Sequence, residues 1–146
     1  MEPKILVSAC LAGQKCRYNA SHALNPDLMN RLQGEKVVTC CPEIMAGLPT
    51  PRPSCNIKNG GGLDVLEGRA QVVGVDGKDY TKEFVNGARM VLKRVLDEGI
   101  NTAFLKQNSP SCGCGKIYSP DGAKIIDGDG VTAALLKQNG IKIESL

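Results

Sequence analysis

Short runs of β-branched and apolar residues alternate with helix-type patterns along nearly the whole chain, and this alternation limits the possible folds more than any other feature. The apolar runs predict buried strands at 4–9, 36–39, 102–106 and 141–144. The segments between them predict helices at 25–32, 81–98 and 130–138. Successive parallel strands are joined by right-handed crossovers. We therefore predict an α/β, Rossmann-like fold in which residues 1–146 form a single domain with a mainly parallel sheet flanked by helices.

The helix expected at 81–98 has the clearest pattern. Its apolar stripe consists of Phe84, Ala88, Val91, Leu92 and Val95. Gly99 follows as a stop signal. A shorter pattern predicts a strand at 70–75, which we expect to pair with 63–66 as a hairpin.

The late segment GDGVTAALL, residues 128–136, opens a helix with a glycine-rich turn. Such a turn can bind phosphate, but this one lacks the Lys and Ser or Thr of a P-loop. We therefore expect Asp129 to cap the helix instead.

Seven cysteines in 146 residues are more than packing requires. A chain of this length with 42% hydrophobic residues can build a core without cross-links. The N-terminus lacks the basic and long apolar regions of a secretory signal, and no run is long enough for a membrane span. We therefore expect a cytoplasmic protein with no membrane association, whose reduced thiols bind metal or take part in thiol chemistry.

Charge and aromatic content indicate the class of partner. The 18 basic residues are scattered among 15 acidic ones, and the chain has no Trp. A nucleic-acid polymer is therefore not expected as a partner. A small modified base remains compatible with this composition, because a pocket needs few residues. The sequence indicates no particular oligomeric state.

Three cysteines follow three of the predicted strands. Cys10 follows the first strand, Cys41 the second, and Cys112 the strand at 102–106. Loops beyond the carboxyl ends of parallel strands face a common crevice, so these thiols are expected to meet there. Cys41 also precedes Pro42 and Glu43 at a predicted helix start, where the unpaired amides stabilise a thiolate.

Three thiolates are compatible with zinc or with an iron–sulfur cluster. An all-thiolate zinc site needs a fourth ligand, for which Cys16, Cys40, Cys55 and Cys114 are the candidates. A four-iron cluster held by three thiolates leaves one iron open as a Lewis acid.

The polar residues beside these cysteines each have a simpler interpretation. Glu43 suits the first turn of a helix, and Ser109 and Ser111 suit a turn that caps backbone amides. Arg17 and Arg52 are able to hold a substrate carbonyl or anion, although exposure to solvent is the default for arginine. Packing is favoured for Cys40, Cys55 and Cys114, whereas Cys16 is open between packing, ligation and a substrate-side thiol.

Five motifs together resemble one known family in order and spacing: VSACLAG, CRYN, CCPEIMAGLPTPRP, LKQNSPSCG and GDGVTAALL. This is the family once described as a domain of unknown function and now associated with thiouracil desulfidase. The resemblance implies a 4Fe-4S cluster on Cys10, Cys41 and Cys112. It also implies that Glu43 handles protons for an attacking water and that Ser109 assists substrate or sulfur transfer.

The activity implied by the resemblance is hydrolytic, non-redox removal of sulfur from thiouracil or a related small thiolated base, with release of hydrogen sulfide. Such an enzyme would take part in sulfur metabolism. The chain departs from the family pattern at Asn19 and Ala20, where Asp-Gly is usual, and at Ala46, where a glycine is common. Two alternatives stay open: a non-catalytic carrier of zinc, iron or persulfide, and a cluster-dependent hydro-lyase.

Overall fold

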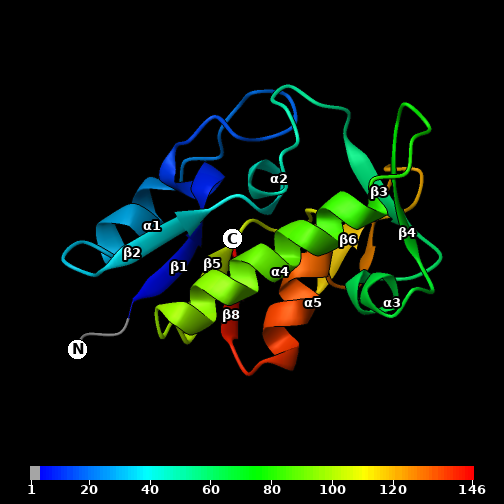
Figure 1. The fold of residues 1–146 in the computed structure, drawn as a ribbon. Helices are drawn as coiled ribbons and strands as arrows, with labels where there is room; N and C mark the ends of the chain where they lie inside the picture. The colour runs from blue at the N-terminus through cyan, green and yellow to red at the C-terminus, as the bar shows by residue number, and fades with distance from the viewer. Residues whose placement is uncertain (1–3) are drawn as a thin grey trace.

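The central feature of the fold is a four-stranded parallel sheet. The computed structural model describes residues 4–146. The sheet has the order β2-β1-β5-β8, and every neighbouring pair is parallel (Figure 1). Its strands are β1 (Ile5–Ser8), β2 (Val37–Cys40), β5 (Thr102–Leu105) and β8 (Lys142–Ser145). The α/β fold class predicted from the alternating pattern is confirmed.

Helices cover both faces of this sheet (Figure 1). The crossover helices are α1 (Pro26–Arg31), α4 (Thr81–Asp97) and α5 (Val131–Gln138). Leu6 and Ala103 pack in one cluster with residues of α4 and α5, whereas Val7 and Phe104 pack in another with Leu28 of α1. Successive residues of β1 and β5 therefore point to opposite, equally buried faces, which explains why their sequences are continuously apolar.

Local signals explain where the crossover helices begin and how closely they pack. The Asn25 side chain accepts a hydrogen bond from Leu28 N at 3.0 Å, which caps α1 as expected from the sequence. In α4, the predicted stripe faces the core, with Phe84 and Val95 buried. Gly87 lies on the same helix where the Pro42 carbonyl oxygen approaches; a Cβ there would lie 2.3 Å from that oxygen. This glycine lets α4 pack directly against the short helix that follows Cys41.

Smaller elements extend the fold beyond the central sheet. They are the 3-10 helix η1 (Ala9–Ala12), α2 (Pro42–Met45), β3 (Cys55–Lys58), α3 (Gly62–Leu66), β4 (Gln71–Gly74), β6 (Lys116–Tyr118) and β7 (Ile125–Asp127). β3 pairs with β4, and β6 pairs with β7, to form two antiparallel two-stranded sheets. A third apolar cluster, which includes Ile57, Val72 and Phe84, packs these two small sheets against α4.

The predicted hairpin between 63–66 and 70–75 is wrong. Residues 63–66 lie in α3, and the partner of β4 is Cys55–Lys58. The Asp64 carboxylate accepts a hydrogen bond from Gly61 N at 2.9 Å, which favours a helix start at this point. The true partner strand buries only Ile57, so it lacks the alternating pattern that identifies a strand. Within residues 4–146, no helix is both long enough and apolar enough to cross a bilayer.

Candidate functional site

A cavity of about 450 Å³ opens where β1, β2 and β5 end at their carboxyl termini. Cys10, Cys41 and Cys112 all line it, together with Glu43 and Ser109. The structure thus brings all five candidate site residues to one cavity. In this topology the chain leaves β1 toward α1 on one face of the sheet and leaves the neighbouring β5 toward α5 on the other face. Open α/β folds place their ligand sites at such a point.

Each of the three cysteines is held by a different element. Cys10 lies in η1, directly after β1, and Cys41 is the N-cap residue of α2. Cys112 lies in the loop that follows β5. The thiols are close enough that ionised Cys41 and Cys112 each oppose ionisation of Cys10. All three cysteines belong to the lining of the same cavity.

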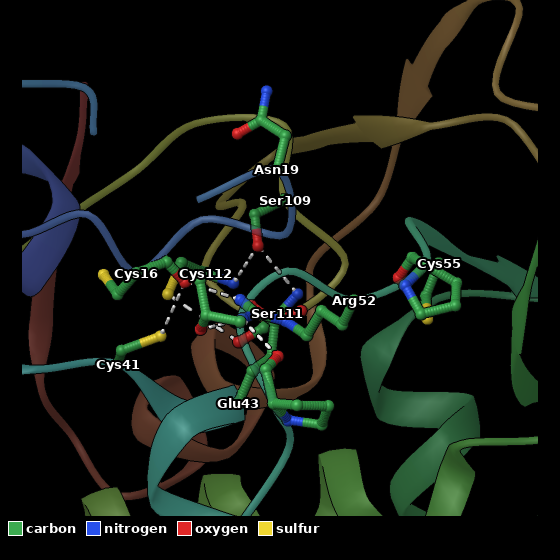
Figure 2. Close-up of polar contacts among 12 residues, drawn as sticks. Cys16, Asn19, Cys41, Glu43, Arg52, Cys55, Ser109, Ser111 and Cys112 are labelled. Carbon is green, nitrogen blue, oxygen red and sulfur yellow. Dashed lines mark hydrogen bonds and ion pairs between the residues drawn. The ribbon is translucent and has the colours of Figure 1, made fainter. Parts of the chain in front are cut away.

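The loop that carries Cys112 is tied to the first turn of α5. The Ser109 hydroxyl oxygen accepts hydrogen bonds from the backbone N–H groups of Ser111 and Cys112, each at 3.0 Å (Figure 2). The carbonyls of Pro110 and Ser111 in turn accept from the first amides of α5. The chain therefore caps α5 with the same backbone that positions Cys112.

The prediction that Asp129 caps α5 is wrong. The N-cap residue is Gly130, which has no side chain that could cap the helix. Asp129 instead accepts a hydrogen bond from Gly115 N at 2.7 Å and pairs with Lys137 at 3.0 Å. The reason is the close approach of the loop: a Cβ on Gly130 would lie 2.5 Å from the carbonyl carbon of Ser111.

Two serine hydroxyls surround the Cys112 thiol. Ser111 Oγ lies 3.7 Å from Cys112 Sγ, and the Ser8 side chain also forms a hydrogen bond to this sulfur. Burial raises the pKa of Cys112 to about 12, while both hydroxyls act in the opposite direction by stabilising the thiolate. Ser8 also accepts a hydrogen bond from Lys106 N at 3.0 Å, so it joins the ends of β1 and β5.

Cys16 lies between Cys10 and Cys41. A hydrogen bond between the side chains of Cys10 and Cys16 lowers the pKa of Cys10 and raises that of Cys16 to about 11. The hydrogen bond of Cys41 with Cys16, followed by burial, raises the pKa of Cys41. The Cys41 thiol also donates to the Cys16 carbonyl oxygen at 3.8 Å (Figure 2). Of the four cysteines outside the predicted ligand set, Cys16 has the most direct contacts with that set.

Glu43 and Arg52 form an ion pair beside the thiols, in which Arg52 is buried and Glu43 is partly exposed. Arg52 Nη2 lies 3.1 Å from Glu43 Oε2, and the Arg52 side chain is only 3% exposed. The default expectation of an exposed arginine at position 52 is therefore wrong. Burial raises the pKa of Glu43, whereas the guanidinium of Arg52 opposes that shift. The stiff segment with three prolines at 49–53 carries the arginine inward.

The remaining cysteines differ in their surroundings. Cys40 is buried in the core beneath α4 and also reaches the cavity wall. Cys55 lines the cavity on the side of β3, although its sequence context indicated only packing (Figure 2). Cys114 is absent from the lining and packs against the core, as expected. His22 accepts a hydrogen bond from Leu24 N in a loop.

Part of the cavity lining was not predicted from the sequence. It includes Asn56 at the start of β3, Tyr118 at the end of β6, and Tyr18 in the loop after Cys16. The two tyrosines are 41% and 42% exposed, so each reaches both the cavity and the solvent. Lys106 also reaches the lining, and burial lowers its pKa. The position of Lys106 after a parallel strand was a usable signal, whereas only tertiary packing brings Asn56 and Tyr118 here.

Within the described part of the chain, no three His, Cys, Asp or Glu side chains are gathered tightly enough to hold a single metal ion. An iron–sulfur cluster has a different requirement, because each thiolate binds a separate iron at its own corner. Thiols spread around the wall of one cavity suit that requirement.

Comparisons with known proteins agree with the motifs and the fold. A family model described as 2-thiouracil desulfurase matches residues 5–145. The uncharacterized protein YbbK of Bacillus subtilis is 44% identical over 142 residues, which cover 97% of this chain and 94% of that protein. The solved structure of the [4Fe-4S]-dependent thiouracil desulfidase TudS matches with a TM-score of 0.86 and 39% identity, over 99% of this chain and 91% of that one. The chain therefore belongs to the 2-thiouracil desulfurase family.

Proposed function

We propose that this protein is a 4Fe-4S-dependent desulfidase that hydrolyses the carbon–sulfur bond of thiouracil or a related small thiolated base. The observation that carries the proposal is the position of Cys10, Cys41 and Cys112 around one cavity at the carboxyl ends of three strands. In the net reaction, water replaces sulfur: the C=S group and H₂O become a C=O group and H₂S. No electrons are gained or lost, so no redox partner is needed.

The donor set fits an iron–sulfur cluster. Cys10, Cys41 and Cys112 would hold it, and hydrogen bonds from Ser8 and Ser111 would stabilise the Cys112 thiolate. The cluster would supply an iron without a protein ligand, which acts as a Lewis acid toward the substrate sulfur. All seven cysteines are free, which supports a reducing compartment such as the cytoplasm.

Glu43 is placed to handle protons. It lines the cavity from the first turn of α2, two residues after Cys41. Its Oε2 atom accepts a hydrogen bond from Arg52, and the Glu43 side chain forms no other hydrogen bond within residues 4–146. The second carboxylate oxygen is therefore available to accept a proton from the attacking water and to deliver one to the departing sulfide.

Ser109 is placed to donate a hydrogen bond into the cavity. Two backbone N–H groups already occupy the acceptor positions of its hydroxyl oxygen. The hydroxyl proton therefore remains for an acceptor on the substrate. The interpretation of Ser109 as a turn-stabilising residue and its proposed role toward substrate are compatible, because one hydroxyl performs both.

The part of the cavity lined by Asn56, Tyr18 and Tyr118 would receive the pyrimidine ring. Asn56 offers both a donor and an acceptor, which matches the neighbouring N–H and C=O groups of a uracil edge. Its side chain forms no hydrogen bond with the described residues, so both groups are available. Tyr18 and Tyr118 in the cavity lining provide aromatic surface against which a planar base can pack.

Anaerobic reconstitution with iron and sulfide, followed by measurement of sulfide released from 2-thiouracil, tests the proposal. We expect the native protein to be brown and active. Cys112→Ala should lose most of its iron and its activity. Cys114→Ala is the matched control, because Cys114 lies on the same loop but not on the cavity, and it should retain both.

Two outcomes would contradict the proposal. A native protein that stays colourless and binds zinc tightly would instead support a metal carrier. A Cys112→Ala variant that keeps a full complement of iron and full activity would remove this residue from the ligand set.

A further inference from the structure

The Arg52 side chain is buried behind the cavity wall. It pairs with Glu43, which lines the cavity, but is not itself part of the lining. Its guanidinium donates to four acceptors. Nη2 reaches the Cys16 carbonyl at 2.7 Å and Glu43 Oε2 at 3.1 Å. Nη1 reaches the Pro49 carbonyl at 3.3 Å and Thr50 Oγ1 at 3.1 Å. Arg52 therefore acts on the site from behind its wall.

These contacts connect two segments that carry proposed site residues. The Cys16 carbonyl lies in the loop after Cys10, and it accepts from the Cys41 thiol as well as from Arg52. The backbone N–H of Arg52 donates to the Tyr18 carbonyl at 2.7 Å in the same loop. Glu43 belongs to α2. The loop after β1 and the helix after β2 are thus joined through one residue.

Stability alone does not account for this arrangement. Burying an ion pair removes two charges from water, and an apolar replacement of similar volume often gives an equally stable protein. Arg52 Nε is also buried and has no hydrogen-bond partner among residues 4–146, which adds to the unfavourable desolvation. A function for the charged group at this position is therefore the better explanation.

We propose that Arg52 is a positioning residue that fixes the Glu43 carboxylate relative to the Cys16 carbonyl and so sets the geometry of the thiol side of the cavity. The part that concerns Glu43 rests on the function proposed above. Arginine suits this task because its planar guanidinium presents donors in fixed directions to several acceptors at once. Lysine carries the same charge but directs it from a single, flexible nitrogen.

The test is the Arg52→Lys variant, with Arg69→Lys as the matched control. Arg69 also pairs with carboxylates, Asp64 and Glu67, but its side chain is 57% exposed and lies outside the cavity. In reconstituted Arg52→Lys we expect unchanged iron content and a fall in kcat of up to about 10²-fold, as misplaced catalytic groups typically produce. KM should change less than kcat, and Arg69→Lys should match the native protein.

A double variant separates positioning from a general structural effect. If Arg52 acts through Glu43, then Arg52→Lys should lower kcat little further in a Glu43→Gln background. Multiplying losses, or a native kcat in Arg52→Lys, would overturn the proposal.

Hydrogen–deuterium exchange on the metal-free protein gives a readout that does not depend on turnover. Amides of residues 13–21 should exchange faster in Arg52→Lys than in the native protein or in Arg69→Lys. Unchanged exchange in this segment would overturn the positioning role. A native protein that releases no sulfide, combined with faster exchange in Arg52→Lys, would contradict the proposed function while supporting the positioning of the loop.

Discussion

The two ends of the central sheet are built differently. At the amino end, each crossover helix is followed by a glycine with positive φ before the next strand begins. These glycines are Gly34 after α1, Gly99 after α4 and Gly140 after α5. A Cβ at any of them would meet nothing within 4 Å. These three turns at the amino end therefore depend on local backbone conformation rather than on side-chain packing.

At the carboxyl end, the loops after the strands depend on one another. The loop after β5 caps α5, and Arg52 joins the loop after β1 to α2. Here Gly130 has an ordinary φ of −70°, but the space for its side chain is taken by Ser111. A substitution at the amino end should therefore alter stability, whereas one at the carboxyl end should alter chemistry.

Replacing a carboxylate at each end gives the largest expected contrast. Glu43→Gln should lower kcat for sulfide release by about 10²- to 10⁴-fold, because the amide cannot accept a proton as a general base. Glu98→Gln, at the amino end, removes a partner of Lys4 and Arg94 and should leave kcat unchanged. Iron content and steady-state kinetics measure both. Equal kcat values in the two variants would break the comparison.

A glycine at each end of α5 gives an intermediate contrast. Gly140→Ala forces alanine into a left-handed conformation, which should lower the free energy of unfolding by about 1–2 kcal/mol with full activity retained. Gly130→Ala should cost a similar amount, about 1–3 kcal/mol, through steric overlap with Ser111. It should also displace the Cys112 loop and reduce iron content.

Thermal unfolding and iron analysis of the Gly140→Ala and Gly130→Ala variants measure these effects on stability and on iron content. A Gly130→Ala variant with native iron content would show that the loop tolerates displacement. Loss of iron in Gly140→Ala would show that the amino end influences the site.

The smallest effect concerns the pH dependence of stability at the amino end. Hydrogen bonds from Lys4 and then Arg94 lower the pKa of Glu98. A carboxyl with a lowered folded-state pKa stabilises the protein above its unfolded pKa, and this contribution is lost as the pH falls through the folded value. The Tm difference between native protein and Glu98→Gln should therefore be small at neutral pH and vanish in acid. A difference that persists in acid would refute the ion-pair explanation.

Continuously apolar strands such as β1 and β5 were recognisable from sequence because both of their faces are buried. The sequence pattern predicts the wrong partner for β4, because its true partner, β3, buries a single residue, Ile57. Asp129 was assigned to the wrong contact for a related reason. The backbone N–H groups at the start of α5 already donate to carbonyl oxygens of the loop at 110–113, and residue pattern alone does not place that loop there.

The sequence by itself determined the parallel α/β architecture and the expectation that Cys10, Cys41 and Cys112 share one edge of the sheet, because strand polarity and periodicity are local properties. Only the tertiary structure decided that Arg52 is buried against Glu43 and that Cys16 touches two of those cysteines. It also placed Asn56 and Tyr118 in the lining of the same cavity. These contacts join segments far apart in the chain, and long-range packing rather than residue pattern sets their distances.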